Sequence, residues 1–589
     1  MVKSQAKKNM FLSQANSLDT NYSECLRKAD SYRVNKDYLN AEKFYKKALS
    51  YKPDDLMIMV SLGLLIYTYG DLDRDEEASS YLLKVRELEP NLPEINLALA
   101  NICKRSQQYI HAIKFFNSEI AIRKKLKQDI PRELYEYLGS CHNEIGQTDE
   151  AIKIVYPLIN KYPLLLSNYQ DLLLLMAHSD KFDDKATNDF AKLAYSQCLA
   201  KSHLMTFKEE IAKIVASNDY LSSTKIKLGI ISSKIHSAYA ERFLADMIDR
   251  FDRDKISIFT YYCGEKDDEL TERFRTLSDK FVKLNYHDFI HNAAAIAADG
   301  VHILIDTLGQ LSGNSLPVLA LKPAPIQASS IGYWGSTGVP EVDYVITQAD
   351  ALTESEQASY NEEIIPLSYV YYNISREDIA IEDSPITKNG YITFGCQNRR
   401  QKYNSDVLNL WASILSDLPE SRLLLTTNLG EEKAYTDYVH SFFTRQGVDP
   451  NRVVIEYKAS TDEYFHNYNR IDIVLDPYPF TGGCSSVDAI YMGKPIVTLR
   501  GKKLVGRITA EHLKHVEAEE LIVENKEDYK VKAIELAKDF NKIKEYNRIL
   551  RQKLLESIII DPEFCSKEYQ NAIEHMYKVK FATLPWERN

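Results

Sequence analysis

A regular spacing of small residues and prolines constrains the first third of this 589-residue chain more than any other feature. A small residue is followed twelve positions later by alanine, and twelve further on by proline. Two sets keep this spacing: Ala29, Ala41 and Pro53, and Gly139, Ala151 and Pro163. A third set, Gly63, Ala78 and Pro90, fits with a three-residue insertion near Gly70. A weaker set, Ala100 and Ala112, lacks the proline. The pattern predicts a stack of short helix pairs.

This spacing is typical of the tetratricopeptide repeat, whose period is about 34 residues. Small side chains let the two helices of a repeat cross closely, and proline ends the second helix before the next repeat begins. Tyr32, Phe44, Tyr45 and Ala48 are expected to fill the core positions between them. We predict four repeats, followed by further helices from residue 164 to about residue 220.

The periodicity changes at Lys225, where short apolar runs begin to alternate with helical stretches. This alternation predicts an α/β fold with buried parallel strands. Three strands are expected before a linker at 365–388 and five after it: 226–233, 256–261 and 302–306, then 391–395, 422–426, 453–456, 473–476 and 495–498.

The predicted organisation is a tail at 1–20, an all-α repeat array at 21–220, and two Rossmann-like halves at 221–385 and 386–589. In open α/β sheets, ligands bind outside the carboxyl ends of the strands. We therefore expect one cleft between the two halves, lined by the loops that follow their strands.

The composition narrows the class of protein. The formal net charge of −11 argues against a general nucleic-acid binder. The 8 cysteines form no CxxC pair, which is typical of isolated thiols in a reducing compartment. The first residues lead into no apolar signal segment, and no window reaches the about 18 apolar residues of a membrane-spanning helix. We therefore predict a cytoplasmic protein that does not insert into membranes.

The segment after the strand at 473–476 has the features of an anion site. Two glycines, Gly482 and Gly483, precede a helix that starts with Cys484, Ser485 and Ser486. Exposed N–H groups and the helix dipole favour a phosphate at such a helix start. Asp488 lies one turn further, where a carboxylate accepts hydrogen bonds from ribose hydroxyls. The alternative is a plain strand-to-helix loop with a capping serine.

Cations follow the strand at 391–395. Arg399, Arg400 and Lys402 come just after it and are expected to point toward the cleft. A leaving diphosphate needs such cations to stabilise its developing charge. A solvated basic loop explains the segment equally well when it is taken alone.

Together these segments resemble the protein O-GlcNAc transferase family, glycosyltransferase family 41. The resemblance covers roughly residues 20 to 580, with the motifs in the family's order and spacing behind a tetratricopeptide array. It rests on the segments Lys322–Ala328, Gly332–Gly338, Asp343–Thr347, Ile392–Lys402, Asp406–Leu415 and Leu475–Pro495.

The resemblance implies a GT-B fold and an inverting transfer from a UDP-sugar to a protein side chain, without a metal or another cofactor. Lys402 falls on the family's diphosphate-contacting lysine, beside Arg399. Cys484 and Ser485 fall on its phosphate-contacting pair at the helix start, and Asp488 on its ribose-binding aspartate. Three further positions match an arginine of the final motif, a histidine in a strand lining the active site, and the uracil-contacting segment: Arg507, His302 and Ala459.

The chain departs from the family at positions near the acceptor and at positions on the uracil side of the site. The family's histidine in the first loop is replaced by Ala238, with His236 two residues earlier. We consider His236, His302 and Asp306 as candidates for the general base, which must reach the acceptor directly or through one water. The other departures are Gln310, Ser315, Thr461 and Tyr464, with His466 two residues beyond Tyr464.

The predicted function is transfer of GlcNAc from UDP-GlcNAc to Ser or Thr of an acceptor protein held by the repeats. One alternative keeps the fold but changes the sugar, to glucose or a deoxyhexose, or the acceptor, to Asn. Another is a non-catalytic repeat scaffold that supports a partner enzyme. Assembly into homo- or hetero-oligomers is left open.

Overall fold

The computed structural model describes residues 20–588, apart from 237–240, 331, 349–350, 371–378, 428–431 and 458–459. It contains two compact units. One comprises Met1–Ile145 with Glu432–Tyr435, and the other comprises Gly146–Glu431 with Thr436–Asn589. The predicted tail falls outside the described residues, apart from residue 20.

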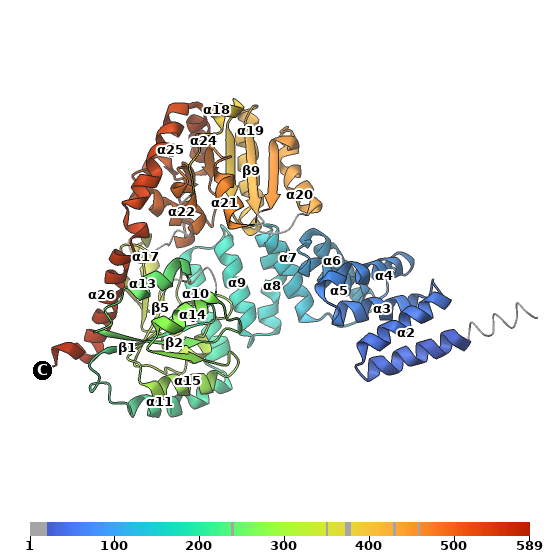
Figure 1. The fold of residues 1–589 in the computed structure, drawn as a ribbon, viewed down its shortest axis with the longest axis horizontal. Coiled ribbons are helices and arrows are strands. Elements are labelled where there is room, and N and C mark those ends of the chain that lie inside the picture. The colour runs from blue at the N-terminus through green and yellow to red at the C-terminus, as the bar shows by residue number, and fades with distance from the viewer. Residues whose placement is uncertain are drawn as a thin grey trace, which may run out of the picture. The chain divides into compact units, whose positions relative to one another are not determined.

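The first unit is built from helix pairs, as the repeat spacing predicts (Figure 1). A helix at 20–34 is followed by α2 (Tyr38–Tyr51), α3 (Leu56–Tyr69), α4 (Asp75–Leu88), α5 (Ile95–Arg105), α6 (Tyr109–Lys125) and α7 (Arg132–Glu144). The alanines of the pattern are fully buried: Ala29, Ala41, Ala78, Ala100 and Ala112. At Gly63 an added Cβ would lie 2.8 Å from the Leu82 side chain, which explains the small residue there. Pro53 and Pro90 follow the ends of α2 and α4.

The second unit begins with four helices that precede the first sheet. These are α8 (Thr148–Lys161), α9 (Leu166–His178), α10 (Asp184–Ala194) and α11 (Lys208–Ala216). They belong to the same compact unit as the sheets, whereas the sequence predicted them as part of the repeat array at 21–220. Asn188 of α10 shows the connection, because its amide donates to Ser359 Oγ (2.8 Å) and accepts from the Ser336 N–H (2.9 Å).

The first half is a seven-stranded parallel sheet in the order β3-β2-β1-β4-β5-β6-β7. Its apolar strands lie in a buried core that includes Ile230, Ile305 and Ala328. The strands are β1 (Ile226–Ser232), β2 (Ile256–Tyr262), β3 (Lys280–Lys283), β4 (Ile303–Asp306), β5 (Ile326–Ser330), β6 (Tyr344–Thr347) and β7 (Glu363–Pro366). Between them lie α13 (Asp246–Asp249), α14 (Glu269–Leu277), α15 (Phe289–Asp299), α16 (Leu316–Leu319) and α17 (Glu354–Gln357).

The second half is a six-stranded parallel sheet in the order β10-β9-β8-β11-β12-β13. Its strands are β8 (Thr393–Gln397), β9 (Arg422–Thr427), β10 (Val453–Tyr457), β11 (Ile473–Leu475), β12 (Ile496–Leu499) and β13 (Ile522–Val523). Its helices are α18 (Ile386–Asn389), α19 (Ser405–Asp417), α20 (Lys433–Thr444), α21 (Thr461–Tyr468), α22 (Cys484–Tyr491), α23 (Ile508–His515), α24 (Lys526–Lys538) and α25 (Phe540–Leu555). The predicted combination of a helical array with two Rossmann-like halves is confirmed.

The last helix, α26 (Pro562–Phe581), returns to the first half (Figure 1). Ile573, Met576 and Tyr577 are fully buried in the core of the first sheet. Tyr569 forms a hydrogen bond with Ser330 at the end of β5. The chain therefore closes the first half with its own C-terminal segment, which the sequence reading had assigned to the second half.

Candidate functional site

The candidate residues gather at the points where the strand order of each sheet reverses. In the first sheet this point lies between β1 and β4, and in the second between β8 and β11. Ligands of open α/β sheets bind at such switch points, outside the carboxyl ends of the strands. Lys402 follows β8 and the Gly482–Gly483 loop follows β11, so both belong to the switch point of the second sheet.

Helix α22 presents its N-terminus at this switch point. Gly483 is the N-cap residue and provides no capping side chain. Ser486 does not cap the helix, because its hydroxyl donates to the Gly483 carbonyl (2.8 Å) and contacts His512 Nδ1 (2.8 Å). The first N–H groups of a helix have no acceptor within it, and the helix dipole favours an anion there. Cys484 and Ser485 occupy this first turn, so the anion-site interpretation fits better than the capping serine.

The glycine loop is held by a buried carboxylate. Asp476 accepts hydrogen bonds from the Gly482 N–H (2.8 Å) and from Thr498 Oγ1 (2.7 Å). Burial raises the pKa of Asp476 to about 6. A Cβ at Gly482 would lie 3.0 Å from Ser486 Cβ and 3.2 Å from Asp476 Oδ1. Glycine is therefore needed for the close packing of this loop.

Lys402 reaches the same loop from the end of the neighbouring strand, β8. Its Nζ donates to the Thr481 carbonyl (2.6 Å) and lies 4.5 Å from the centroid of the Phe480 ring. Burial lowers the pKa of Lys402 to about 8, against the opposing effect of the Asp476 carboxylate. The side chain forms no ion pair with any described residue, so its charge is available to an anion at the start of α22.

Two more cations lie close by. Arg399 is exposed and forms no ion pair within the described part of the chain. Lys234, which follows β1 in the first half, has its pKa lowered by burial and by the positive charge of Arg399. The carboxyl ends of the two sheets thus bring positive charges together, an arrangement suited to a diphosphate.

Asp488 lies one turn into α22 and is buried. Its Oδ2 accepts a hydrogen bond from Tyr464 of α21 (3.1 Å). The neighbouring Tyr468 hydroxyl donates to the Ser485 carbonyl (2.9 Å). Tyr464, which departs from the family pattern, therefore ties the helix of the predicted uracil side to the predicted ribose-binding carboxylate. Ala459 lies outside the described residues, and His466 is exposed on the same helix.

Two of the base candidates lie at the switch point of the first sheet. His236 follows β1, and its Nδ1 is 2.8 Å from the Tyr262 hydroxyl. Asp306 ends β4, where its Oδ2 accepts from the Gly309 N–H (2.6 Å) as a loop-capping carboxylate does. Its Oδ1 is buried without a hydrogen-bond partner among the described residues, and burial raises the pKa of Asp306 to about 7. Ala238 lies outside the described residues.

His302 lies at the opposite edge of the sheet. It precedes β4 at its amino end, and its ring is fully buried. Nδ1 accepts from the Lys227 N–H (2.9 Å), and Nε2 lies 2.9 Å from the Tyr220 carbonyl oxygen. Burial lowers the pKa of His302 to about 4. Both nitrogens are engaged at the edge of the sheet opposite the carboxyl ends of the strands, so we correct its assignment from a catalytic candidate to a structural residue.

The two departures in the second loop of the first half are also engaged in the structure. The Gln310 amide donates to the Thr337 carbonyl (2.5 Å), and Ser315 Oγ lies 3.5 Å from Cys263 Sγ. Both residues are buried. They stabilise the loop after β4. No three His, Cys, Asp or Glu side chains of the described residues group in a way that could hold a metal ion.

The comparisons with known proteins agree with this geometry. Residues 177–375 and 386–573, more than half of the chain, match the model of Glycosyl transferase family 41. The chain belongs to this family. Residues 25–55 also match the Tetratricopeptide repeat model.

Among the relatives of this family 41 chain is the tomato (Solanum lycopersicum) protein named probable UDP-N-acetylglucosamine–peptide N-acetylglucosaminyltransferase SPINDLY. It is 28% identical over 371 residues, which are 61% of this chain and 39% of the relative. The Arabidopsis thaliana protein SEC, named for the same activity, is 25% identical over 354 residues, 57% of this chain and 35% of SEC. The matched region of the chain thus spans only 39% and 35% of the length of these two curated relatives.

The solved structure of an O-GlcNAc transferase mutant from Thermobaculum terrenum has the same fold. Its TM-score is 0.69 at 21% identity, and the alignment covers 96% of this chain and 98% of that one. None of the described helices has the length and apolar character needed to span a membrane.

Two features of this family 41 chain were not singled out for a role by sequence reasoning. The Phe480 ring contacts His178 of α9 and Trp334 of the first half, with ring centroids 4.8 Å and 4.9 Å away. Lys503, after β12, is buried and donates to three carbonyl oxygens around the end of α9. The sequence signals only that an aromatic residue, Phe480, lies beside the glycine loop. It does not show which side chains that ring contacts.

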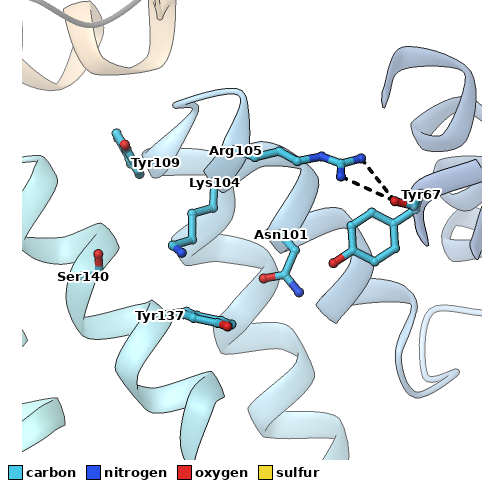
Figure 2. A pocket seen from close by; sticks show the side chains of 7 residues that line it. All are labelled: Tyr67, Asn101, Lys104, Arg105, Tyr109, Tyr137 and Ser140. Atoms are coloured by element: carbon cyan, nitrogen blue, oxygen red, sulfur yellow. Dashed lines mark hydrogen bonds between the residues drawn. The ribbon is translucent and has the colours of Figure 1, made fainter. Parts of the chain in front are cut away.

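The repeat unit holds a separate cavity of about 370 Å³ (Figure 2). Lys104 of α5 points into it, with Nζ 4.1 Å from the centroid of the Tyr137 ring, and forms no ion pair with a described residue. Arg105 is bound to Asp75 (Nε–Oδ2 2.6 Å). The remaining lining residues are Tyr67, Asn101, Tyr109 and Ser140. The cavity therefore presents aromatic faces, an amide and one cation without a carboxylate partner.

Proposed function

We propose that this chain transfers a sugar, GlcNAc as the first candidate, from its UDP derivative to Ser or Thr of an acceptor protein in the cytoplasm. The observation that carries the proposal is the contact of Lys402 with the glycine loop at the N-terminus of α22. This is the arrangement that a leaving diphosphate needs. The names of the tomato and Arabidopsis relatives support UDP-GlcNAc as the donor.

The proposed reaction is a single displacement with inversion at the anomeric carbon. The acceptor oxygen forms a bond to that carbon while the bond to the UDP oxygen breaks, and the acceptor proton passes to a base or to water. Lys402, Arg399 and the first N–H groups of α22 stabilise the charge that develops on UDP. Protein cations supply this stabilisation, so no metal or other cofactor is needed in the proposed mechanism.

The repeats are proposed to hold the acceptor. Their cavity offers a carboxylate of the acceptor one ammonium, Lys104, with an amide and tyrosine rings around it. A cavity of about 370 Å³ is too small to bind more than a small part of an acceptor protein, so it selects one side chain of an extended segment. The acceptor site lies in the repeat unit and the donor site in the other compact unit, so variants can separate the two.

The test is a panel of nucleotide sugars with the purified chain and acceptor proteins from the same cell, followed by UDP release and by the mass gained. Lys402→Ala is expected to abolish UDP release with every donor. Lys388→Ala, an exposed lysine whose nearest acidic partner is 3.5 Å away, is the matched control and should keep full activity.

The outcomes separate the alternatives. Release from UDP-glucose or a deoxyhexose nucleotide, rather than from UDP-GlcNAc, would keep the class and change the sugar. Modified Asn in the product would change the acceptor. Tight UDP binding without turnover of any donor would favour the scaffold alternative, and absence of UDP binding would refute the donor site.

A further inference from the structure

His178 is the last residue of α9, and its ring has a fixed orientation. Its Nδ1 lies 3.0 Å from the Leu174 carbonyl oxygen. A carbonyl only accepts hydrogen bonds, so Nδ1 must carry a hydrogen. Partial burial, together with the charges of Lys402, Lys503 and Arg399, lowers the pKa of His178 to about 4, and the ring is neutral at pH 7. In this neutral form Nε2 is a hydrogen-bond acceptor.

This acceptor lies beside the candidate donor site. The His178 ring is 4.8 Å from the Phe480 ring, between centroids, and Lys402 Nζ is 4.5 Å from the same Phe480 centroid. Phe480 immediately precedes Thr481, whose carbonyl receives the Lys402 hydrogen bond. His178 and Lys402 thus share one aromatic neighbour at the edge of the glycine loop.

The end of α9 is fastened to the second half. Lys503 Nζ donates to the carbonyl oxygens of Met176 (2.6 Å), Ala177 (2.9 Å) and Ser179 (2.6 Å), the residues on either side of His178. The Leu504 N–H donates to Asp184 (2.8 Å), at the start of the next helix. A cation on the last carbonyls of a helix is a favourable cap. These contacts hold His178 in place relative to Phe480.

Other histidines near the candidate site also have ring nitrogens in hydrogen-bond contacts. His302 uses both ring nitrogens within the first half, and His236 Nδ1 contacts Tyr262. His512 is buried against Ser486. His178 Nε2 has no hydrogen-bond partner in the part of the chain that the structure describes, and its ring is only partly buried.

We propose that Nε2 of His178 accepts a hydrogen bond from a hydroxyl group at the reacting centre. The inference rests on the proposed function and names a substrate-contacting residue for it. The hydroxyl belongs either to the transferred sugar or to the attacking acceptor side chain. In the second case Nε2 takes the acceptor proton as the new bond to the anomeric carbon forms and the bond to UDP breaks, and it then releases that proton to water.

The decisive variant is His178→Phe, which keeps an aromatic ring against Phe480 but removes both nitrogens. We expect transfer to fall by about 100-fold or more, in the range of a lost general acid–base group. His178→Gln places an amide oxygen near the Nε2 position and is expected to recover part of the rate. UDP affinity, measured by calorimetry, should stay within about twofold in both variants, because neither removes a phosphate contact.

Hydrolysis of the UDP-sugar by water, without acceptor, identifies the source of the hydroxyl. A sugar hydroxyl predicts that His178→Phe weakens UDP-sugar binding relative to UDP and slows hydrolysis together with transfer. An acceptor hydroxyl predicts slower transfer with unchanged UDP-sugar binding and hydrolysis. Both results support the proposal.

Equal transfer, hydrolysis and UDP-sugar binding in His178→Phe and the wild type would overturn it while leaving the proposed function intact. If the wild type binds UDP-sugars but turns none over, UDP-sugar binding to His178→Phe decides: a loss supports a sugar contact, and no loss overturns the proposal. A wild type that neither binds nor hydrolyses any UDP-sugar would overturn the proposed function and this inference with it.

Discussion

Arg507 and Glu356 form a bidentate ion pair between the two halves of the second unit, with Nη1–Oε2 at 2.8 Å and Nη2–Oε1 at 2.6 Å. Arg507 follows β12 in the second half, and Glu356 lies in α17 of the first. Arg507 also donates to the Ala351 carbonyl (2.6 Å). The family's arginine, for which the sequence suggested no role, therefore connects the two halves around the candidate site.

Arg507→Met is expected to destabilise the second unit by about 3 kcal/mol, because it leaves a largely buried carboxylate without its partner. The double variant Arg507→Met, Glu356→Gln should lose less than the sum of the single changes.

The protein's 3 tryptophans, Trp334, Trp411 and Trp586, all lie in this unit, so urea unfolding followed by tryptophan fluorescence reports on it alone. Lys526→Ala breaks an exposed pair with Asp406 and should cost under about 1 kcal/mol. If Arg507→Met and Lys526→Ala lowered the free energy of unfolding equally, this would contradict the role of Arg507 in connecting the two halves.

The donor site allowed more prediction from sequence than the acceptor side did. Lys402 and the glycine loop both follow strands with strong apolar signals, and the doubly wound topology brings such strand ends together. His302 was misassigned because a residue next to a strand can lie at either of its ends, and these are on opposite edges of the sheet. Sequence position alone does not show that its nitrogens bond to backbone groups of residues 220 and 227.

The missed elements have physical reasons as well. β5 reads Ile-Gln-Ala-Ser-Ser, and its polar residues are buried by contacts that no local pattern shows. β3 is an edge strand with a lysine at each end, and β13 has two residues. Helix α26 packs on a sheet more than two hundred residues earlier in the chain, and His178 reaches Phe480 across a similar separation. Periodicity reports which face of an element is buried, but not against which partner.

UDP affinity is expected to depend on the protonation of Lys402. The pKa of this lysine is lowered to about 8, below its ordinary value, so the free protein loses the ammonium as the pH rises through 8. A diphosphate binds the protonated form, and the dissociation constant of UDP should therefore rise toward tenfold per unit above pH 8. Calorimetry between pH 6.5 and 9.5 measures this. Lys402→Arg keeps its charge over the range and should show a flat profile, whereas a flat wild-type profile would contradict a phosphate contact.

Lys503→Met is expected to impair transfer without removing any phosphate contact. The buried ammonium holds three carbonyl oxygens around the end of α9, and the loss of these charge-assisted hydrogen bonds should cost about 2–4 kcal/mol of stability. Because the same turn carries His178, the variant should lose transfer activity at temperatures where its tryptophan fluorescence is still native. UDP binding by calorimetry should be nearly unchanged. Parallel loss of UDP binding and transfer would instead indicate general unfolding of the second unit.

Lys104→Glu in the repeat cavity is expected to reduce acceptor use and spare donor chemistry. The substitution places a carboxylate between the Tyr137 ring and Asn101, where an acidic acceptor side chain would be repelled. The KM for an acidic acceptor peptide should rise by about tenfold, as expected for the loss of a partly exposed ion pair plus a like-charge contact. UDP-sugar hydrolysis without acceptor should not change, since the donor residues lie in the other compact unit.

Lys124→Glu, on α6 outside the cavity lining, makes the same change in net charge and controls for long-range electrostatics. An equal rise in KM for both variants would assign the effect to overall charge, and an unchanged KM in Lys104→Glu would refute the cavity as part of the acceptor site.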